Sequence, residues 1–84
     1  MYIINTMESS KEHTTDIIQK LGHKIRVERM KRKMSQERLA ELAQLNRNFI
    51  GMVERGETNI TVKNLVNISI AFVINIQDLF DFVL

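Results

Sequence analysis

Arg47 and Asn48 are adjacent residues whose side chains can read the edges of DNA base pairs. An arginine donates two hydrogen bonds to O6 and N7 of guanine, and an asparagine pairs with N6 and N7 of adenine, each good pair giving about 1–3 kcal/mol of discrimination. Gly51 and Met52 follow one helical turn later, where a missing side chain permits close backbone approach and a thioether can touch a thymine methyl group. We therefore predict base contacts from these four residues, with phosphate binding as the alternative for Arg47.

The same chain lacks the residue combinations expected of an enzyme. It has no cysteine nucleophile and no glycine-rich phosphate loop, and none of its serines has a histidine and carboxylate partner in a known motif. His13 and His23 cannot build a structural zinc site by themselves. The sequence therefore predicts a protein without catalytic activity, metal or cofactor.

The elements that must position the base-reading residues lie between Ser35 and Gly56. The pattern predicts short helices over residues 36–43 and 47–55, the second capped by Asn46. Inward-facing apolar residues recur in both at helical spacing, namely Leu39, Leu42, Ala43, Ile50 and Val53. Because very few residues separate the two runs, the helices must cross sharply. This arrangement is typical of a helix-turn-helix, whose second helix enters the DNA major groove.

From about Leu21 to Phe80 the chain resembles the phage-repressor-like helix-turn-helix family, also called the xenobiotic-response-element type. The segments that carry the resemblance are LGHKIRVERMKRKMSQERLAELA, NRNFIGMVERGETNITVKNLVNI and AFVINIQDLF. Within that family, RNFIGMVERGETNIT is similar to the controller proteins of restriction–modification systems, which are small dimeric regulators. Relatives usually carry glycine in the turn where this chain has Gln44, whose backbone angles a non-glycine residue can adopt at some energetic cost.

The resemblance implies roles for several residues. It gives Arg47 a base-reading role, and it gives Gln36 a phosphate contact at the N-terminus of its helix, where anions are favoured. It pairs Arg29 with Glu54 as a buried ion pair. Phe49 stands where the controllers often have tyrosine, so we expect it on the phosphate side, packing against sugar or core without a hydroxyl. The implied partners are a double-stranded DNA operator, a second copy of the chain and RNA polymerase.

Basic residues are concentrated in one part of the sequence. The net charge is only +2, but seven lysines and arginines lie between Lys24 and Arg38, and none lies from Asn64 to the end. Beside a helix-turn-helix, such a cluster favours contacts with phosphates. Residues that follow the second helix of the motif are expected to contact the backbone of the opposite strand, namely Arg55, Asn59 and Lys63.

The periodicity predicts an all-α, five-helix domain of the repressor-like type. Residues 1–15 are expected to form a flexible arm, and residues 16–84 a DNA-binding and dimerisation domain. The first helix should run from Thr15 or Asp16 to about Lys33. Its core stripe contains Glu28, where many relatives have an aliphatic residue, so a rotation of the helix that buries Val27 or Met30 instead is an alternative.

The last two helices are expected over residues 62–72 and 76–82. The inward-facing stripe of the first of them is Val62, Leu65, Ile68, Ser69 and Phe72. A domain of this size buries only about 60–65% of its unfolded surface, and it has no cysteine, so association is the expected source of added stability. The C-terminal end also carries more apolar residues than one short helix can bury. We predict a homodimer interface that includes Val66, Ile70, Ile74, Ile76, Phe80, Phe82 and Val83; completion of the core alone is the alternative.

With the family resemblance, these patterns predict a sequence-specific transcriptional regulator that binds an inverted-repeat operator as a homodimer. The similarity to controller proteins implies that it controls a restriction–modification operon. The alternatives are a phage-type or autoregulatory repressor, and the DNA-binding antitoxin of a toxin–antitoxin pair. No signal peptide and no apolar run approaching ~20 residues is visible, so we expect a cytoplasmic protein without a membrane partner.

Overall fold

The computed structural model describes residues 6–83. Its elements, in chain order, are α1 (Thr6–Lys31), α2 (Gln36–Ala43), α3 (Arg47–Glu54), α4 (Val62–Phe72) and the short 3-10 helix η1 (Ile76–Phe80). No strand occurs within this range, which confirms the all-α class. The predicted fifth helix is a single 3-10 segment, and it ends at Phe80 instead of Phe82.

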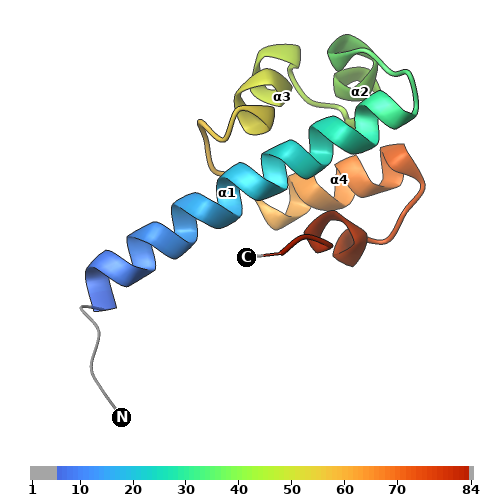
Figure 1. Ribbon diagram of the computed structural model, residues 1–84. Helices are drawn as coiled ribbons and strands as arrows, with labels where there is room; N and C mark the ends of the chain where they lie inside the picture. The colour runs from blue at the N-terminus through green and yellow to red at the C-terminus, as the bar shows by residue number, and fades with distance from the viewer. Residues whose placement is uncertain (1–5, 84) are drawn as a thin grey trace.

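The first helix is longer at its N-terminus than the sequence predicted. It begins at Thr6, not near Thr15 or Asp16, and ends at Lys31. The predicted arm is therefore helical from Thr6 onward, and residues 1–5 lie outside the described range. No glycine or proline precedes Gly22, so a helix nucleated where α1 packs against the domain meets no residue that breaks it. Figure 1 shows this N-terminal part of α1 extending beyond the other helices.

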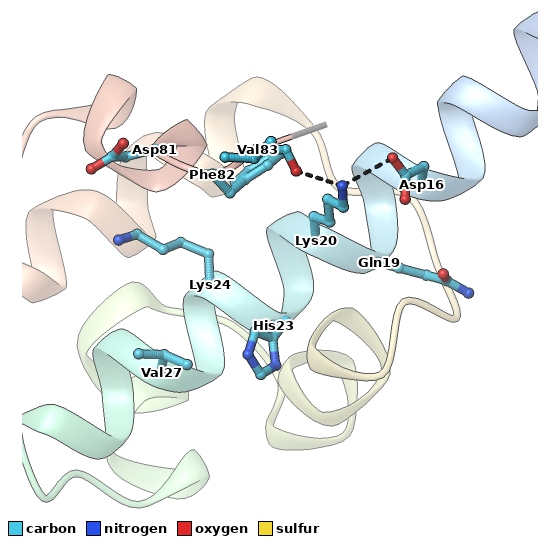
Figure 2. A pocket seen from close by; sticks show the side chains of 9 residues that line it. All are labelled: Asp16, Gln19, Lys20, His23, Lys24, Val27, Asp81, Phe82 and Val83. Atoms are coloured by element: carbon cyan, nitrogen blue, oxygen red, sulfur yellow. Dashed lines mark hydrogen bonds and ion pairs between the residues drawn. The ribbon is translucent and has the colours of Figure 1, made fainter.

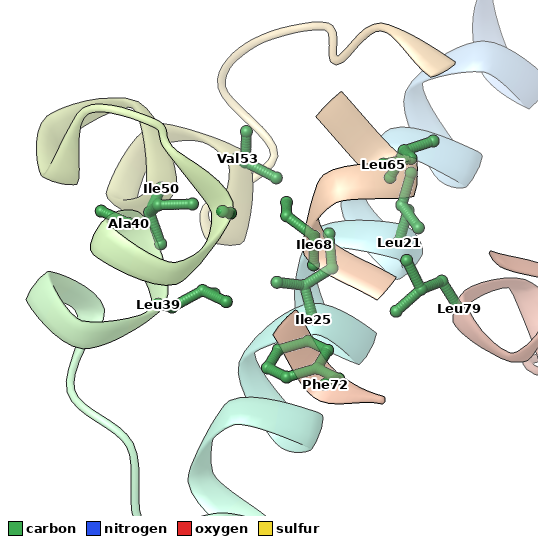
Figure 3. Close-up of a cluster of buried hydrophobic side chains, with 11 residues drawn as sticks. Leu21, Ile25, Leu39, Ala40, Ile50, Val53, Leu65, Ile68, Phe72 and Leu79 are labelled. Atoms are coloured by element: carbon green, nitrogen blue, oxygen red, sulfur yellow. The ribbon is translucent and has the colours of Figure 1, made fainter. Parts of the chain in front are cut away.

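Eleven buried apolar side chains, drawn from every element, form one core (Figure 3). They are Leu21, Ile25, Leu39, Ala40, Ala43, Ile50, Val53, Leu65, Ile68, Phe72 and Leu79. Two residues predicted to face inward do not: Val62, the first residue of α4, is 70% exposed, and Leu42 is 40% exposed. Within residues 6–83, no helix is both long and apolar enough to span a bilayer.

Glu28 keeps its place in the core stripe of α1, so the helix does not rotate away from it. The residue is 8% exposed, whereas Met30 is 56% exposed. Its carboxylate contacts the side chains of Lys24 (3.2 Å) and Lys31 (3.1 Å) on the same helix, and that of Arg32 (3.0 Å) just after the end of the helix. These three cations compensate the negative charge of Glu28, so the carboxylate can stay at a buried position.

The helix-turn-helix is held by local backbone chemistry. The hydroxyl of Ser35 accepts a hydrogen bond from the backbone N–H of Arg38 (2.9 Å), and the side chain of Asn46 accepts one from the N–H of Asn48 (2.7 Å), as expected for N-caps. Between the helices, Gln44 has φ 58° and ψ 43°, which is the left-handed conformation that ends α2.

Gly22 permits the close crossing of α1 and α3. A Cβ atom at this position would lie 2.1 Å from the backbone carbonyl oxygen of Val53, a distance that no side chain can adopt without displacing the backbone. The missing side chain lets α3 rest directly on α1, which sets the position of the recognition helix relative to the core.

Candidate nucleic-acid interface

The helix α3 has one polar, exposed face that begins at its N-terminus. The side chain of Arg47 is 55% exposed, and Asn48 and Met52 are exposed as well. Ile50 and Val53, on the other side of the helix, lie in the core. In a helix-turn-helix, the residues at the N-terminus of the second helix contact base edges, and the exposed face of α3 begins at that end.

The structure buries Gly51, which the sequence placed on the outer face of α3. A Cβ atom there would lie 3.1 Å from Nη1 of Arg55 and 3.8 Å from Nε2 of Gln36. Because these two side chains cover the glycine, a base contact at Gly51 requires the guanidinium of Arg55 to turn away. In the free protein, the predicted base-reading residues that reach the surface are Arg47, Asn48 and Met52.

Gln36 belongs to a hydrogen-bonded network that joins α1, α2 and α3. Its amide nitrogen donates to Glu54 (3.0 Å), and Glu54 also accepts two hydrogen bonds from the guanidinium of Arg29, at 2.7 and 3.0 Å. Arg29 donates further to the backbone carbonyl of Met34 (2.8 Å). The carboxylate of Glu54 raises the pKa of Arg29, against the effect of burial. The ion pair implied by the family resemblance is therefore present, and it holds Gln36 at the N-terminus of α2.

Three of the other predicted phosphate contacts, Arg55, Asn59 and Lys63, lie around the end of α3 and the start of α4. Asn59 and Lys63 are exposed. Arg55 is exposed and forms an ion pair with Glu57 (2.9 Å), which raises the pKa of Arg55 and lowers that of Glu57. Phe49 is half-buried and packs against the core, so its available surface suits packing against a sugar.

Glu37 is a residue of this surface that the sequence did not single out. Its carboxylate accepts a hydrogen bond from Nε of Arg47 at 2.9 Å, which joins the first turn of α2 to the first turn of α3. A hydrogen bond from its own backbone N–H, followed by the one from Arg47, lowers the pKa of Glu37. The pair is ten residues apart on separate helices, so spacing alone gave no signal of it.

The predicted dimer residues divide into two groups. Ile70 and Val83 are 65% and 88% exposed, and Val66 and Phe80 are 37% and 43% exposed. The other three, Ile74, Ile76 and Phe82, are half-buried and pack against the core. Val73, which directly follows α4, is 88% exposed beside Ile70 and Ile74. An apolar surface therefore remains at this end of the domain after the core is complete.

A hollow of about 470 Å³ lies between α1 and the C-terminal residues Phe82 and Val83 (Figure 2). Its lysines already have partners. Lys20 contacts Asp16 (3.3 Å) and the carbonyl of Val83, and Lys24 contacts a carboxylate on its own helix. Because those charges are compensated, the hollow has no evident preference for an anion.

The model of the helix-turn-helix family matches residues 25–79, which include both helices of the motif, the interface described above and every core residue except Leu21. The chain belongs to the helix-turn-helix family. The control protein C.BamHI of Bacillus amyloliquefaciens is 40% identical to it over 70 residues, covering 82% of this chain and 86% of that protein. The control protein C.SmaI of Serratia marcescens is 43% identical over 51 residues, covering 61% of each.

A solved structure supports the same relationship for this helix-turn-helix protein. The restriction–modification controller protein C.AhdI of Aeromonas hydrophila has a TM-score of 0.74 and 37% identity, covering 77% of this chain and 97% of the controller. The protein is thus a DNA-binding regulator similar to restriction–modification controllers, and its relatives are regulators, not enzymes.

Proposed function

We propose that the protein is a sequence-specific transcription regulator that binds an inverted-repeat operator as a homodimer and controls a restriction–modification operon. The exposed polar face of α3 carries the proposal, since its three surface side chains can each contact a different base edge. The names of the relatives support the class of operon. RNA polymerase at the adjoining promoter is the further partner that such regulation implies.

The side chains around α3 are proposed to divide the work of binding. Arg47 and Asn48 read bases, and Met52 touches a thymine methyl group. A larger set holds the DNA backbone, and it comprises Gln36, Phe49, Arg55, Asn59 and Lys63. Contacts with phosphate fix the orientation of the protein on the duplex, and contacts with base edges give the sequence preference.

A homodimer would match the symmetry of the proposed operator. The exposed residues near the C-terminus that are proposed to pair are apolar, which suits a two-fold contact, because a charge close to the axis would face its own copy. Figure 1 shows α3 and η1 on opposite sides of α1. Pairing through the C-terminal end would therefore leave both copies of α3 free to enter successive major grooves, about 34 Å apart.

The base-reading role is tested by comparing Arg47→Ala with Lys63→Ala. Binding is measured for the purified protein alone, on the DNA upstream of its own gene and on a scrambled duplex of the same length, over a series of KCl concentrations. Arg47→Ala should remove the preference for the upstream DNA while largely preserving salt-dependent binding to the scrambled duplex. Lys63→Ala should weaken both complexes alike and reduce the salt slope by about one unit.

Equal losses from Arg47→Ala on the two duplexes would assign Arg47 to the backbone. A wild-type protein that binds DNA only together with a second protein would contradict the proposal and favour the antitoxin alternative. The class of operon is tested separately by its neighbouring genes, which should encode an endonuclease and a methyltransferase.

A further inference from the structure

Glu37 holds Arg47 by one edge of the guanidinium. The hydrogen bond runs from Nε of Arg47 to Oε1 of Glu37 at 2.9 Å. Within residues 6–83, neither terminal nitrogen of Arg47 donates a hydrogen bond to another residue. These two nitrogens present parallel donors, which is the geometry that matches O6 and N7 of guanine. The ion pair therefore restrains the side chain while it leaves the base-reading edge unoccupied.

The charge of Glu37 also bears on which DNA atoms Arg47 can contact. The side chain of Glu37 is 65% exposed and follows Gln36, a proposed phosphate contact. A phosphate that approaches Arg47 meets this carboxylate and is repelled, and it must also compete with it for the guanidinium. A guanine edge is neutral, so it experiences less repulsion. The carboxylate therefore disfavours binding to the DNA backbone more strongly than binding to a base.

Two other exposed arginine–glutamate pairs show why this one is distinct. Arg38 pairs with Glu41 within α2, and Arg55 pairs with Glu57 two residues along the chain. Both pairs are local, and neither links the two helices of the motif. The pair of Glu37 with Arg47 does link them, so it sets the direction of a side chain on α3 from a fixed point on α2.

We propose that Glu37 is a specificity-determining residue, which positions Arg47 for base contact and opposes its binding to phosphate. The proposal rests on the base-reading role proposed for Arg47. This role would explain why Glu37, an exposed acidic residue, lies on a surface that must approach DNA.

The test is Glu37→Gln, which removes the charge and keeps the size and an acceptor oxygen. Affinity is measured by fluorescence anisotropy on two probes over a series of KCl concentrations. One is the duplex that the wild-type protein selects from a random-sequence library, and the other is a scrambled duplex of equal length. The variant should bind the scrambled duplex about three- to tenfold more tightly, with a steeper salt dependence. Binding to the selected duplex should not improve, so the ratio of the two affinities should fall about tenfold.

Glu41→Gln is the matched control, because it makes the same charge change one turn further along α2. It should alter binding to both probes by the same factor. Glu37→Gln introduced into Arg47→Ala should leave the ratio of affinities at the value of Arg47→Ala, since the position then has no side chain to direct. Glu37→Ala repeats the comparison with the acceptor oxygen also removed, and should lower the ratio at least as much.

The outcomes separate this inference from the proposed function. If Glu37→Gln changes both affinities by the same factor, or changes neither, Glu37 is not a specificity determinant, while DNA recognition by Arg47 stands. If Glu37→Gln lowers the ratio equally in the presence and absence of the Arg47 side chain, the residue acts through another group. If the wild-type protein selects no sequence from the library, the proposed function itself fails.

Discussion

Glu28 shows how one residue can carry a charge at a core position. Hydrogen bonding from Arg32 is the main effect that lowers its pKa from 4.5 to about 2, with Lys31 and Lys24 adding to it and burial opposing it. Arg32 also donates to the backbone carbonyl of Phe72 (3.0 Å) and lies 4.7 Å from the centre of its ring. The carboxylate thus helps to orient a cation that fastens α1 to the end of α4.

Glu28→Gln should reduce the free energy of unfolding by about 2–3 kcal/mol at pH 7, because the three cations lose their shared carboxylate. A carboxyl group whose pKa is lower in the folded state stabilises the fold fully above its unfolded pKa, 4.5 here, and loses that effect as the pH falls toward about 2. The difference between wild type and variant, measured by urea unfolding, should therefore be constant above about pH 5 and shrink between pH 4.5 and 2.

Glu41→Gln serves as the comparison for Glu28. Its pair with Arg38 is exposed, so we expect a change below about 0.5 kcal/mol at any pH. A Glu28→Gln variant as stable as the wild type at pH 7 would show that the network contributes nothing net.

At the scale of the element, the turn between α2 and α3 holds a non-glycine residue in a conformation that favours glycine. Gln44 adopts the left-handed conformation without being glycine, and its backbone N–H still bonds to the carbonyls of Ala40 and Glu41. The turn therefore keeps the geometry of the motif, but the Cβ atom of Gln44 crowds the backbone in this conformation. The steric cost is about 1–2 kcal/mol for a residue with a Cβ atom.

Gln44→Gly should raise the free energy of unfolding by about 0.5–1 kcal/mol, because the relief of strain exceeds the added entropy of the unfolded chain. For a domain of this size, the midpoint of thermal unfolding should rise by about 2–8 °C at a fixed protein concentration. Glu41→Gly, at an exposed position inside α2, should lower the stability by about 1 kcal/mol. A Gln44→Gly variant that is less stable than the wild type would mean that the glutamine side chain makes a compensating contact.

At the scale of the whole molecule, the proposed dimer interface can be tested by substitution of exposed apolar residues. Ile70 is the best probe of it, because the residue is 65% exposed and its replacement leaves the core intact. Phe82 is a poorer probe, since it is half-buried and packs against the core. Val62, in the same helix, is 70% exposed and provides a matched position away from the C-terminal end.

Ile70→Asp should convert the protein from dimer to monomer at micromolar concentration, because the new charges would face each other across the two-fold axis. Sedimentation velocity measures this directly, and the variant should also bind a full operator far more weakly than the wild type. Val62→Asp should remain dimeric. A wild-type protein that is monomeric at micromolar concentration, or an Ile70→Asp variant that still dimerises, would place the interface elsewhere.

The sequence by itself was enough for features that depend on neighbouring residues. The bounds predicted for α2 and α4 match the structure, and Asn46 caps α3 as predicted. Caps and helical periodicity act within a few residues, so they can be read directly from the chain. The N-terminus of α1 was missed because a weakly amphipathic segment gives little periodic signal, although nothing in it stops a helix.

Only the tertiary structure decided which side chains meet across helices. Glu37 reaches Arg47, Arg55 and Gln36 cover Gly51, and Val62 stays exposed although it continues a helical stripe. The first two outcomes depend on how closely α1, α2 and α3 cross, which Gly22 permits and the shared core sets. Spacing along one helix determines which face a residue occupies, but the packing of several helices determines what lies opposite that face.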